Sequence, residues 1–455
     1  LLMAFGAVVM TVGTPNEVYA QSNAGGSIFG RANPGSTIQI SNADNGIKRT
    51  ITVDASGRYQ VTSLPIGSYK VDLLKAGKVE QSTTLDVSLG QGSEAVFQET
   101  SGATQVVQVS GARKPIDISS TNNGSNFSAR QLEKLPVGRS IEAIVQLAPN
   151  TTRGDSRFAG NGASIGGGAV TENSYYINGF PMTNPLTGFG SAQLPFGAIA
   201  EAQVLTGGFG AEFGRSIGGV LNVITKSGKN NWEAGVMSSW SPNSLRSKPR
   251  DIYYPNTGRS YNSATDGTVY IRRQDNTAET KLLGGYVGGP IVQDKLFMFL
   301  SAEQTKISEG FVNGPRVSTT NAKDGWNDRD TTINRYMAKF DWNITDDHRL
   351  EFLSIGDSPV QKIQRSGYDY ATSARVGSVT SAQTNRNIND NGNQLNGIKY
   401  VGELTQNLTL TGLIGHEVSK HEQNLVGYNP SAMGVVADPA NRAPGLSYNN
   451  PQSFT

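Results

Sequence analysis

The segment GGFGAEFGRSIGGVLNVITKSG, residues Gly207–Gly228, is the most informative part of this sequence. Glycines crowd its first half, which suits a backbone that bends sharply or packs closely against another segment. An apolar, β-branched run follows at Gly219–Thr225 and stops at Lys226-Ser227-Gly228. Such a run is typical of a strand covered by protein on both faces. The stretch predicts a glycine-rich turn leading into a buried strand, and an ordinary buried strand after a loop is the alternative.

Two further motifs precede this stretch. In LPVGRSIEAIVQLAPN (residues 135–150), Ser140 is positioned as the N-cap of a short helix that Pro149 ends. One face of that helix carries Ile141, Ile144, Val145 and Ala148. The segment NSYYINGF (residues 173–180) predicts a strand and a tight hairpin turn at Asn178-Gly179.

Residues 22–100 predict a small β-sandwich. Turn signals such as Asp54-Ala55-Ser56-Gly57 separate short alternating runs, which is the pattern of an all-β module. The chain has no histidine before His348. A zinc site of the carboxypeptidase type needs histidine ligands, so such a site cannot lie in residues 22–100. The expected strands are residues 37–40, 50–53, 58–61, 69–73 and 84–87.

In this order the motifs closely resemble TonB-dependent outer-membrane receptors. GAEFGRSIGGVLNVITKSG resembles the end of their plug domain, and DASGRYQVTSLPIGSYKVDL (residues 54–73) is similar to carboxypeptidase-regulatory-like domains. That combination marks the Oar-like branch, and the resemblance spans residues 22–305. It implies a plug over residues 116–230, an outer-membrane location and transport energised by the partner protein TonB.

Residues 101–115 form a polar connector that the resemblance identifies as the tether carrying the TonB box. An extended segment of this kind adds as a strand to its partner, and because backbone bonds supply the affinity, the sequence demand is loose. An ordinary linker or edge strand is the alternative. The box residues are Val106, Val107, Gln108, Val109, Ser110 and Gly111.

Within the glycine turn, the resemblance implies a structural or gating role for Glu212, Arg215, Gly218 and Gly219. Charges at such positions in the family pair with residues of the barrel wall. Two solvated loop charges are the alternative interpretation of Glu212 and Arg215.

From residue 231 to residue 455 the pattern predicts antiparallel strands of a membrane barrel. In residues 295–305, Leu296, Met298 and Leu300 share one face, and Ser301 and Glu303 lie on the other. Short links alternate with long polar ones at 241–279, 306–334 and 356–393, as in outer-membrane barrels. A soluble sandwich is the alternative. The expected strands are residues 232–240, 280–288, 295–305, 335–343, 349–355, 394–403 and 408–417.

Composition further limits the classes of protein and of partner. The 455 residues carry 39 Lys+Arg against 37 Asp+Glu, so a general attraction to nucleic acid is not indicated. There is no cysteine, which excludes disulfides within these residues. Residues 1–20 read as the apolar core and V-Y-A cleavage site of a signal peptide without its basic start. A plugged barrel needs about 22 strands, so we expect a fragment that lacks more than half of its barrel.

Motifs of enzymes are not found. His416 and His421 are five residues apart, one too many for the H-E-x-x-H metal motif. The glycine runs at 160–166 and 208–214 each miss the dinucleotide fingerprint by one position, and there is no P-loop. An enzyme, a metal site and a cofactor are therefore not expected.

The sequence thus predicts a mainly β protein: a small sandwich, an α+β plug and the first part of a large antiparallel transmembrane barrel. The predicted function is active uptake of an unidentified extracellular substrate across the outer membrane, with TonB and outer-membrane lipid as partners. The alternative is an adhesion or envelope-structural protein that uses the same scaffold without transport.

Overall fold

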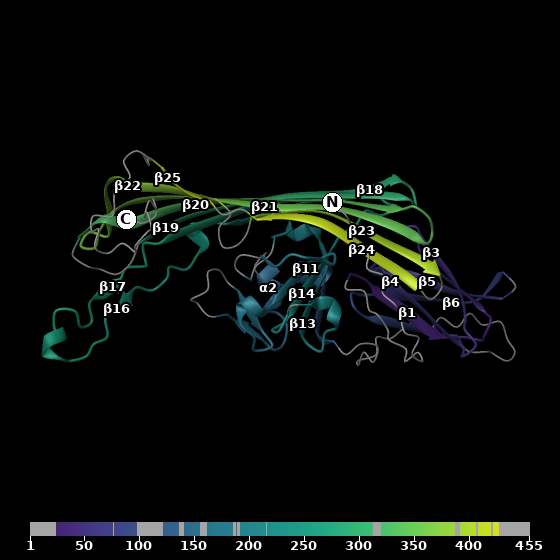
Figure 1. The fold of residues 1–455 in the computed structure, drawn as a ribbon. Helices are drawn as coiled ribbons and strands as arrows, with labels where there is room; N and C mark the ends of the chain where they lie inside the picture. Colours follow the sequence, from purple (N-terminus) through teal and green to yellow (C-terminus); the bar gives the residue numbers. More distant parts are fainter. Residues whose placement is uncertain are drawn as a thin grey trace, which may run out of the picture. The chain divides into compact units, whose positions relative to one another are not determined.

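The computed structural model describes residues 24–75, 77–97, 122–135, 141–154, 162–184, 188, 192–214, 216–312, 320–386, 392–405, 408–419 and 422–426. The predicted signal peptide and the Val106–Gly111 segment lie outside these residues. The chain divides into two compact units: one contains the N-terminal strands, and the other contains nearly everything from residue 122 onward (Figure 1).

The N-terminal unit consists of two small sheets. One has the order β4-β1-β7, with β1 and β7 parallel, and the other has the order β3-β2-β5-β6. The five expected strands are present, and β1 and β7 are additional. Glycine weakens the sequence pattern of β1, so this strand was not predicted. Glycine is required at Gly30 because a side chain there would place its Cβ 1.7 Å from the Ala95 carbonyl oxygen. The strands are β1 Gly26–Arg31, β2 Thr37–Asn42, β3 Ile47–Thr52, β4 Arg58–Leu64, β5 Gly67–Lys75, β6 Lys78–Val87 and β7 Gly92–Val96.

The second unit begins with the plug segment, which we define as residues 122–225. Its sheet has the order β12-β11-β14-β13-β8, and all six residues of the central strand β14 are buried. This confirms the predicted buried strand. The elements are β8 Asn123–Ser128, α1 Ala129–Lys134, α2 Ile141–Val145, β9 Thr151–Arg153, β10 Ala163–Ile165, β11 Ser174–Ile177, β12 Phe180–Pro181, β13 Ile199–Gly207 and β14 Val220–Thr225, with short 3-10 turns at Val170–Glu172, Phe196–Ala198 and Ala211–Phe213.

Two local predictions for the plug segment are confirmed. Helix α2 buries Ile141, Ile144 and Val145, the face expected from the sequence. Asn178 and Gly179 have φ angles of 52° and 90°, so β11 and β12 form the expected tight hairpin. In the described residues, no helix has the length and apolar character needed to cross a membrane.

The rest of the second unit is a large antiparallel sheet, which we call the wall. Nine strands of the described residues join it, in the order β15-β18-β19-β20-β21-β22-β25, with β23 and β24 continuing from the first half of β21. A separate hairpin, β16 Ile252–Tyr253 with β17 Val269–Ile271, lies between β15 and β18. The wall strands are β15 Glu233–Ser241, β18 Thr277–Val292, β19 Leu296–Val312, β20 Thr320–Asn343, β21 His348–Asp369, β22 Ala374–Arg386, β23 Asn393–Thr405, β24 Leu408–Ser419 and β25 Glu422–Val426.

The long links expected at 306–334 and 356–393 are mostly strand, which corrects the sequence prediction. Strand β19 runs on to Val312, β20 starts at Thr320, and β21 reaches Asp369 before β22 follows. A strand needs only about 9–11 residues to cross a bilayer, so these extensions project beyond it. Most residues of these extensions are polar, even where the side chain is buried, as at Ser366, so the apolar alternation that reveals a strand in sequence is lost.

The two faces of the wall differ as predicted where the strands are apolar. Phe297, Phe299 and Ser301 of β19 are buried on the face toward the plug segment, while Leu300 is exposed on the other. The outward face is rich in exposed large apolar side chains, as expected of a surface that meets lipid. They include Leu300, Tyr336, Trp342, Phe352 and Ile398.

Candidate functional site

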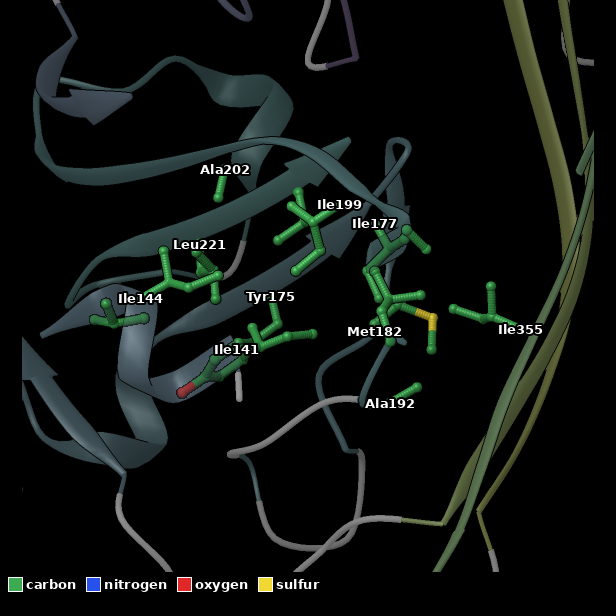
Figure 2. Close-up of a cluster of buried hydrophobic side chains, with 14 of the residues drawn as sticks. Ile141, Ile144, Tyr175, Ile177, Met182, Ala192, Ile199, Ala202, Leu221 and Ile355 are labelled. Atoms are coloured by element: carbon green, nitrogen blue, oxygen red, sulfur yellow. The ribbon is translucent and has the colours of Figure 1, made fainter. Parts of the chain in front are cut away.

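The candidate site is the interface between the plug segment and the inward face of the wall. Apolar side chains of both parts form one buried cluster there. In Figure 2, Met182 of the plug segment points toward Ile355 of β21, and both are fully buried. The plug core behind Met182 contains Tyr175, Ile177 and Leu221, so the contact with the wall continues directly into that core.

Beside this apolar contact, the wall buries a group of charged side chains, which we call the wall charges. They lie on the inward-facing positions of four neighbouring strands, and acids and bases are equal in number. Seven of them are at most 8% exposed, and Arg349 is slightly more open. The acids are Glu303, Asp341, Glu351 and Asp357, and the bases are Arg335, Lys339, Arg349 and Lys399.

Six of the wall charges pair with one another across the strands. Arg335 lies opposite Glu303 in the register of β19 and β20, and its Nη1 donates to Glu303 Oε1 at 2.6 Å. Lys339 Nζ lies 3.2 Å from Glu351 Oε2. Arg349 donates to Asp341. A buried ion is tolerated only when it is paired and hydrogen-bonded, and these three pairs meet that need within the wall itself. Asp357 instead accepts from the backbone N–H groups of Gly392 and Asn393, each at 3.1 Å.

The plug segment reaches carboxylates of the wall charges with neutral donors. Asn178 Nδ2, in the hairpin turn, donates to Glu351 Oε1 at 2.8 Å, and the backbone N–H of Phe196 donates to Glu303 Oε2 at 3.1 Å. The same Asn178 accepts from the Thr225 N–H at 2.9 Å, which ties the turn to the end of β14. If the plug segment moved away from the wall, water would hydrate these neutral donors. No ion pair among the wall charges would be broken.

The chain passes from the plug segment to the wall through Lys226-Ser227-Gly228, the end of the stretch Gly207–Gly228. Lys226 Nζ lies 4.8 Å from the centre of the Tyr286 ring of β18 and 3.8 Å from a Glu133 carboxylate oxygen of the plug segment. A Cβ at Gly228 would stand 2.3 Å from the Met298 carbonyl oxygen, so only glycine fits where the chain crosses the first wall turn. This end of the interface is therefore fixed covalently and by close packing.

The predicted site residues fall in different places. Glu212 is exposed in the 3-10 turn Ala211–Phe213, whereas Gly218 and Gly219 are buried. The Gly219 N–H donates to Asn173 Oδ1 at 3.2 Å. Arg215 and the TonB-box residues lie outside the described residues.

The wall charges and Asn178 are not among the site residues predicted from the sequence. The signal was present, because polar residues occupy the inward positions of strands whose outward positions are apolar. Among the described residues, no group of three or more His, Asp or Glu side chains could hold a metal ion, and His416 is exposed on β24. The arrangement suits a separable contact between two bodies.

Replacing Asn178 with Asp tests the contact between the hairpin turn and the wall. Asp tolerates the positive φ of 52°, so the turn persists, but a carboxylate then faces Glu351 in place of a donor. We expect the plug segment to be held less firmly by about 1–2 kcal/mol. Limited proteolysis of the solubilised protein should cut the plug segment faster. Asn178→Ser, which keeps a neutral donor, should have the smaller effect, and equal effects of the two changes would contradict the assignment.

Comparison with known proteins identifies both N-terminal parts. Residues 7–99 match the model of the carboxypeptidase regulatory-like domain, and residues 117–220 match the TonB-dependent receptor plug domain. The chain is 26% identical over 351 residues to the TonB-dependent transporter Oar of Myxococcus xanthus. That alignment covers 68% of this chain and 30% of the relative, so the chain spans about a third of the relative's length.

Two solved structures are also similar. The outer-membrane transporter YddB from Escherichia coli has 16% sequence identity and a TM-score of 0.47, over 65% of this chain and 38% of that one. The siderophore receptor PirA from Acinetobacter baumannii has 17% identity and a TM-score of 0.39, over 65% of this chain and 39% of that one.

Proposed function

We propose that this chain belongs to a TonB-coupled transporter of the outer membrane. Its domain composition is that of an Oar-like TonB-dependent receptor with an N-terminal carboxypeptidase regulatory-like domain. The relative is a transporter and not an enzyme, which favours uptake over adhesion. The outer-membrane location agrees with the plug-domain match and with the apolar outward face of the wall. The substrate comes from outside the cell.

The proposed mechanism is movement of the plug segment away from the wall. Substrate binding on the extracellular side makes residues 106–111 available in the periplasm, where TonB adds to them as a strand. Pulling on the tether then separates the Asn178 turn from Glu351 and Met182 from Ile355. A path opens along the wall charges, which water can solvate once the plug segment has left.

The observation that carries this proposal is the chemistry of the plug–wall contact. The wall charges form ion pairs within the wall, and the bonds that Asn178 and Phe196 of the plug segment make to their carboxylates come from neutral donors. Stranding an unpaired buried charge would cost about 3–5 kcal/mol. Because the wall charges compensate one another, separation avoids that cost, and the force from TonB acts mainly against apolar contact.

Cysteine scanning tests the coupling. The 455 residues contain no cysteine, so single cysteines at Val106–Gly111 give clean thiols in a full-length receptor in which any cysteine beyond these residues is changed to serine. In cells, we expect disulfide crosslinks to a TonB C-terminal domain that bears one cysteine, strengthened by growth in medium containing substrate. Thr50→Cys, at an exposed position of β3, is the control and should not crosslink.

The absence of crosslinks from all six positions, with the receptor correctly placed in the outer membrane, would contradict the TonB-box assignment. Equal crosslinking from Thr50→Cys would mean that the contact is nonspecific.

A further inference from the structure

The chain between β15 and β18 is an ordered structure and not a loose loop. Asp251 Oδ1 accepts from the backbone N–H groups of Arg273 and Gln274 at 2.6 and 2.9 Å. Asn243 Oδ1 accepts from the Ala278 N–H at 3.1 Å, and the Val312 N–H donates to Asn276 Oδ1 at 3.1 Å. Both ends of the segment are therefore pinned to the far ends of the wall strands, on the side away from the short turns.

A cavity of about 730 Å³ lies between this segment and strands β19–β22. Its volume falls within the range of roughly 300–1,000 Å³ that is typical of small-molecule sites. Trp326 and Tyr368 stack in its lining with ring centres 5.9 Å apart, and Phe311 lies under the Arg329 guanidinium. These aromatic contacts give the cavity a firm base.

Positive charge dominates the cavity, although the whole chain is nearly neutral. Five basic side chains line it against two carboxylates. Both carboxylates are engaged: Asp275 accepts from the Tyr368 hydroxyl, and Glu309 is 2.7 Å from Arg329 Nη2. Burial, and then the bond to Asp275, raise the pKa of the Tyr368 phenol, so it remains a neutral donor. The bases are Arg246, Lys248, Arg273, Arg329 and Arg375.

Among the described residues, three of the bases have no carboxylate at ion-pair distance. Arg329 pairs with Glu309, and Arg375 pairs with Asp328. Within the part of the chain that the structure describes, no carboxylate lies at ion-pair distance from Arg246, Lys248 or Arg273. Arg246 and Lys248 come from one end of the pinned segment and Arg273 from the other, so the unpaired charges approach the cavity from two chain segments.

We propose that this cavity binds a small polyanionic solute, one that carries at least two carboxylate or phosphate groups, on the extracellular side of the receptor. Two separated anionic groups would bridge the two segments, and charge-assisted hydrogen bonds would hold each of them. The inference rests on the proposed function, because the bound solute would be one that the receptor collects. The proposal also names the class of substrate, a small polyanion, which the sequence left open.

Direct binding to the full-length receptor in detergent tests the inference without any TonB coupling. Citrate and inorganic tripolyphosphate serve as the carboxylate and phosphate probes, and maltotriose serves as the neutral probe. Isothermal titration calorimetry should detect binding of at least one anion, weakened by added salt, and none of maltotriose. The variant Arg246→Gln/Lys248→Gln/Arg273→Gln should lose at least about tenfold in affinity for that anion.

The matched control removes three exposed bases that do not line the cavity, in Arg250→Gln/Arg259→Gln/Lys306→Gln. It should change the affinity less than about twofold. Equal losses in the two variants would overturn the site in favour of general charge attraction, and so would no binding of either anion by the parent protein. Either result would leave the crosslinking test of the TonB box untouched, so the two proposals can fail separately.

Discussion

Replacing Arg335 with Met should destabilise the folded receptor by about 3–5 kcal/mol, because it leaves the Glu303 carboxylate buried without its partner. Arg335 and Glu303 are 8% and 1% exposed as side chains, and their atoms meet at 2.6 Å. Urea unfolding of the receptor in detergent would measure the loss. Changing Glu303 to Gln in the same protein should restore most of the stability, since the neutral amide oxygen can still accept from the Phe196 N–H.

The same two strands provide the control for this prediction. Arg329 pairs with Glu309 across β19 and β20 as Arg335 does with Glu303, but these two side chains are 33% and 29% exposed. Water screens such a pair, so Arg329→Met should cost under about 1 kcal/mol. Equal losses for Arg335→Met and Arg329→Met would contradict the claim that the wall charges are a buried, mutually compensating set.

The second large effect is expected at Gly219, at the start of the buried strand β14. A Cβ there would stand 2.1 Å from Ile165 Cγ2 and 2.7 Å from the Leu205 carbonyl oxygen. Ile165 is fully buried, so it has little room to move. We expect Gly219→Ala to destabilise the plug segment by about 3 kcal/mol through overpacking, and to make it the first part of the receptor that protease cuts.

Gly207 offers a matched comparison at the other end of the same turn. A Cβ at Gly207 meets no atom within 4 Å. The variant Gly207→Ala should therefore be neutral or slightly stabilising, by up to about 1 kcal/mol, because it restricts the unfolded chain. If Gly219→Ala proved as harmless as Gly207→Ala, the close packing of the glycine turn would be wrong.

Sequence patterns predicted the parts of the fold in which burial is one-sided or complete. The β14 run, the α2 face and the Asn178-Gly179 turn were all recognisable, because each has a local signal of composition or spacing. The inward and outward faces of residues 295–305 followed from alternation alone. The wall continues past the bilayer where that alternation stops, so the full lengths of β20 and β21 could not be predicted.

The site depends on contacts that sequence patterns do not specify. Asn178 and Glu351 are far apart in the chain, and their bond requires the plug segment to be packed against a particular wall strand. The Arg335–Glu303 pair follows from strand register, which short turns set but composition does not reveal. The polyanion cavity depends on side-chain hydrogen bonds within residues 243–278, where the sequence predicted only a polar loop.

In the proposed mechanism, the plug segment leaves the wall when TonB pulls. Met182 reports on this movement, because its side chain is fully buried against the wall beside Ile355. A thiol placed there by Met182→Cys should react with a membrane-impermeant maleimide only when the interface opens. The control is Ile38→Cys, at a fully buried position of the N-terminal unit.

The measurement is the rate at which the maleimide labels the Met182→Cys variant in living cells. The cells grow in medium that contains substrate, with and without a protonophore. We expect labelling at position 182 to be several-fold faster in energised cells than in protonophore-treated ones, with no change at position 38. Equal rates at position 182 in the two conditions would contradict the claim that energised movement of the plug segment opens this receptor.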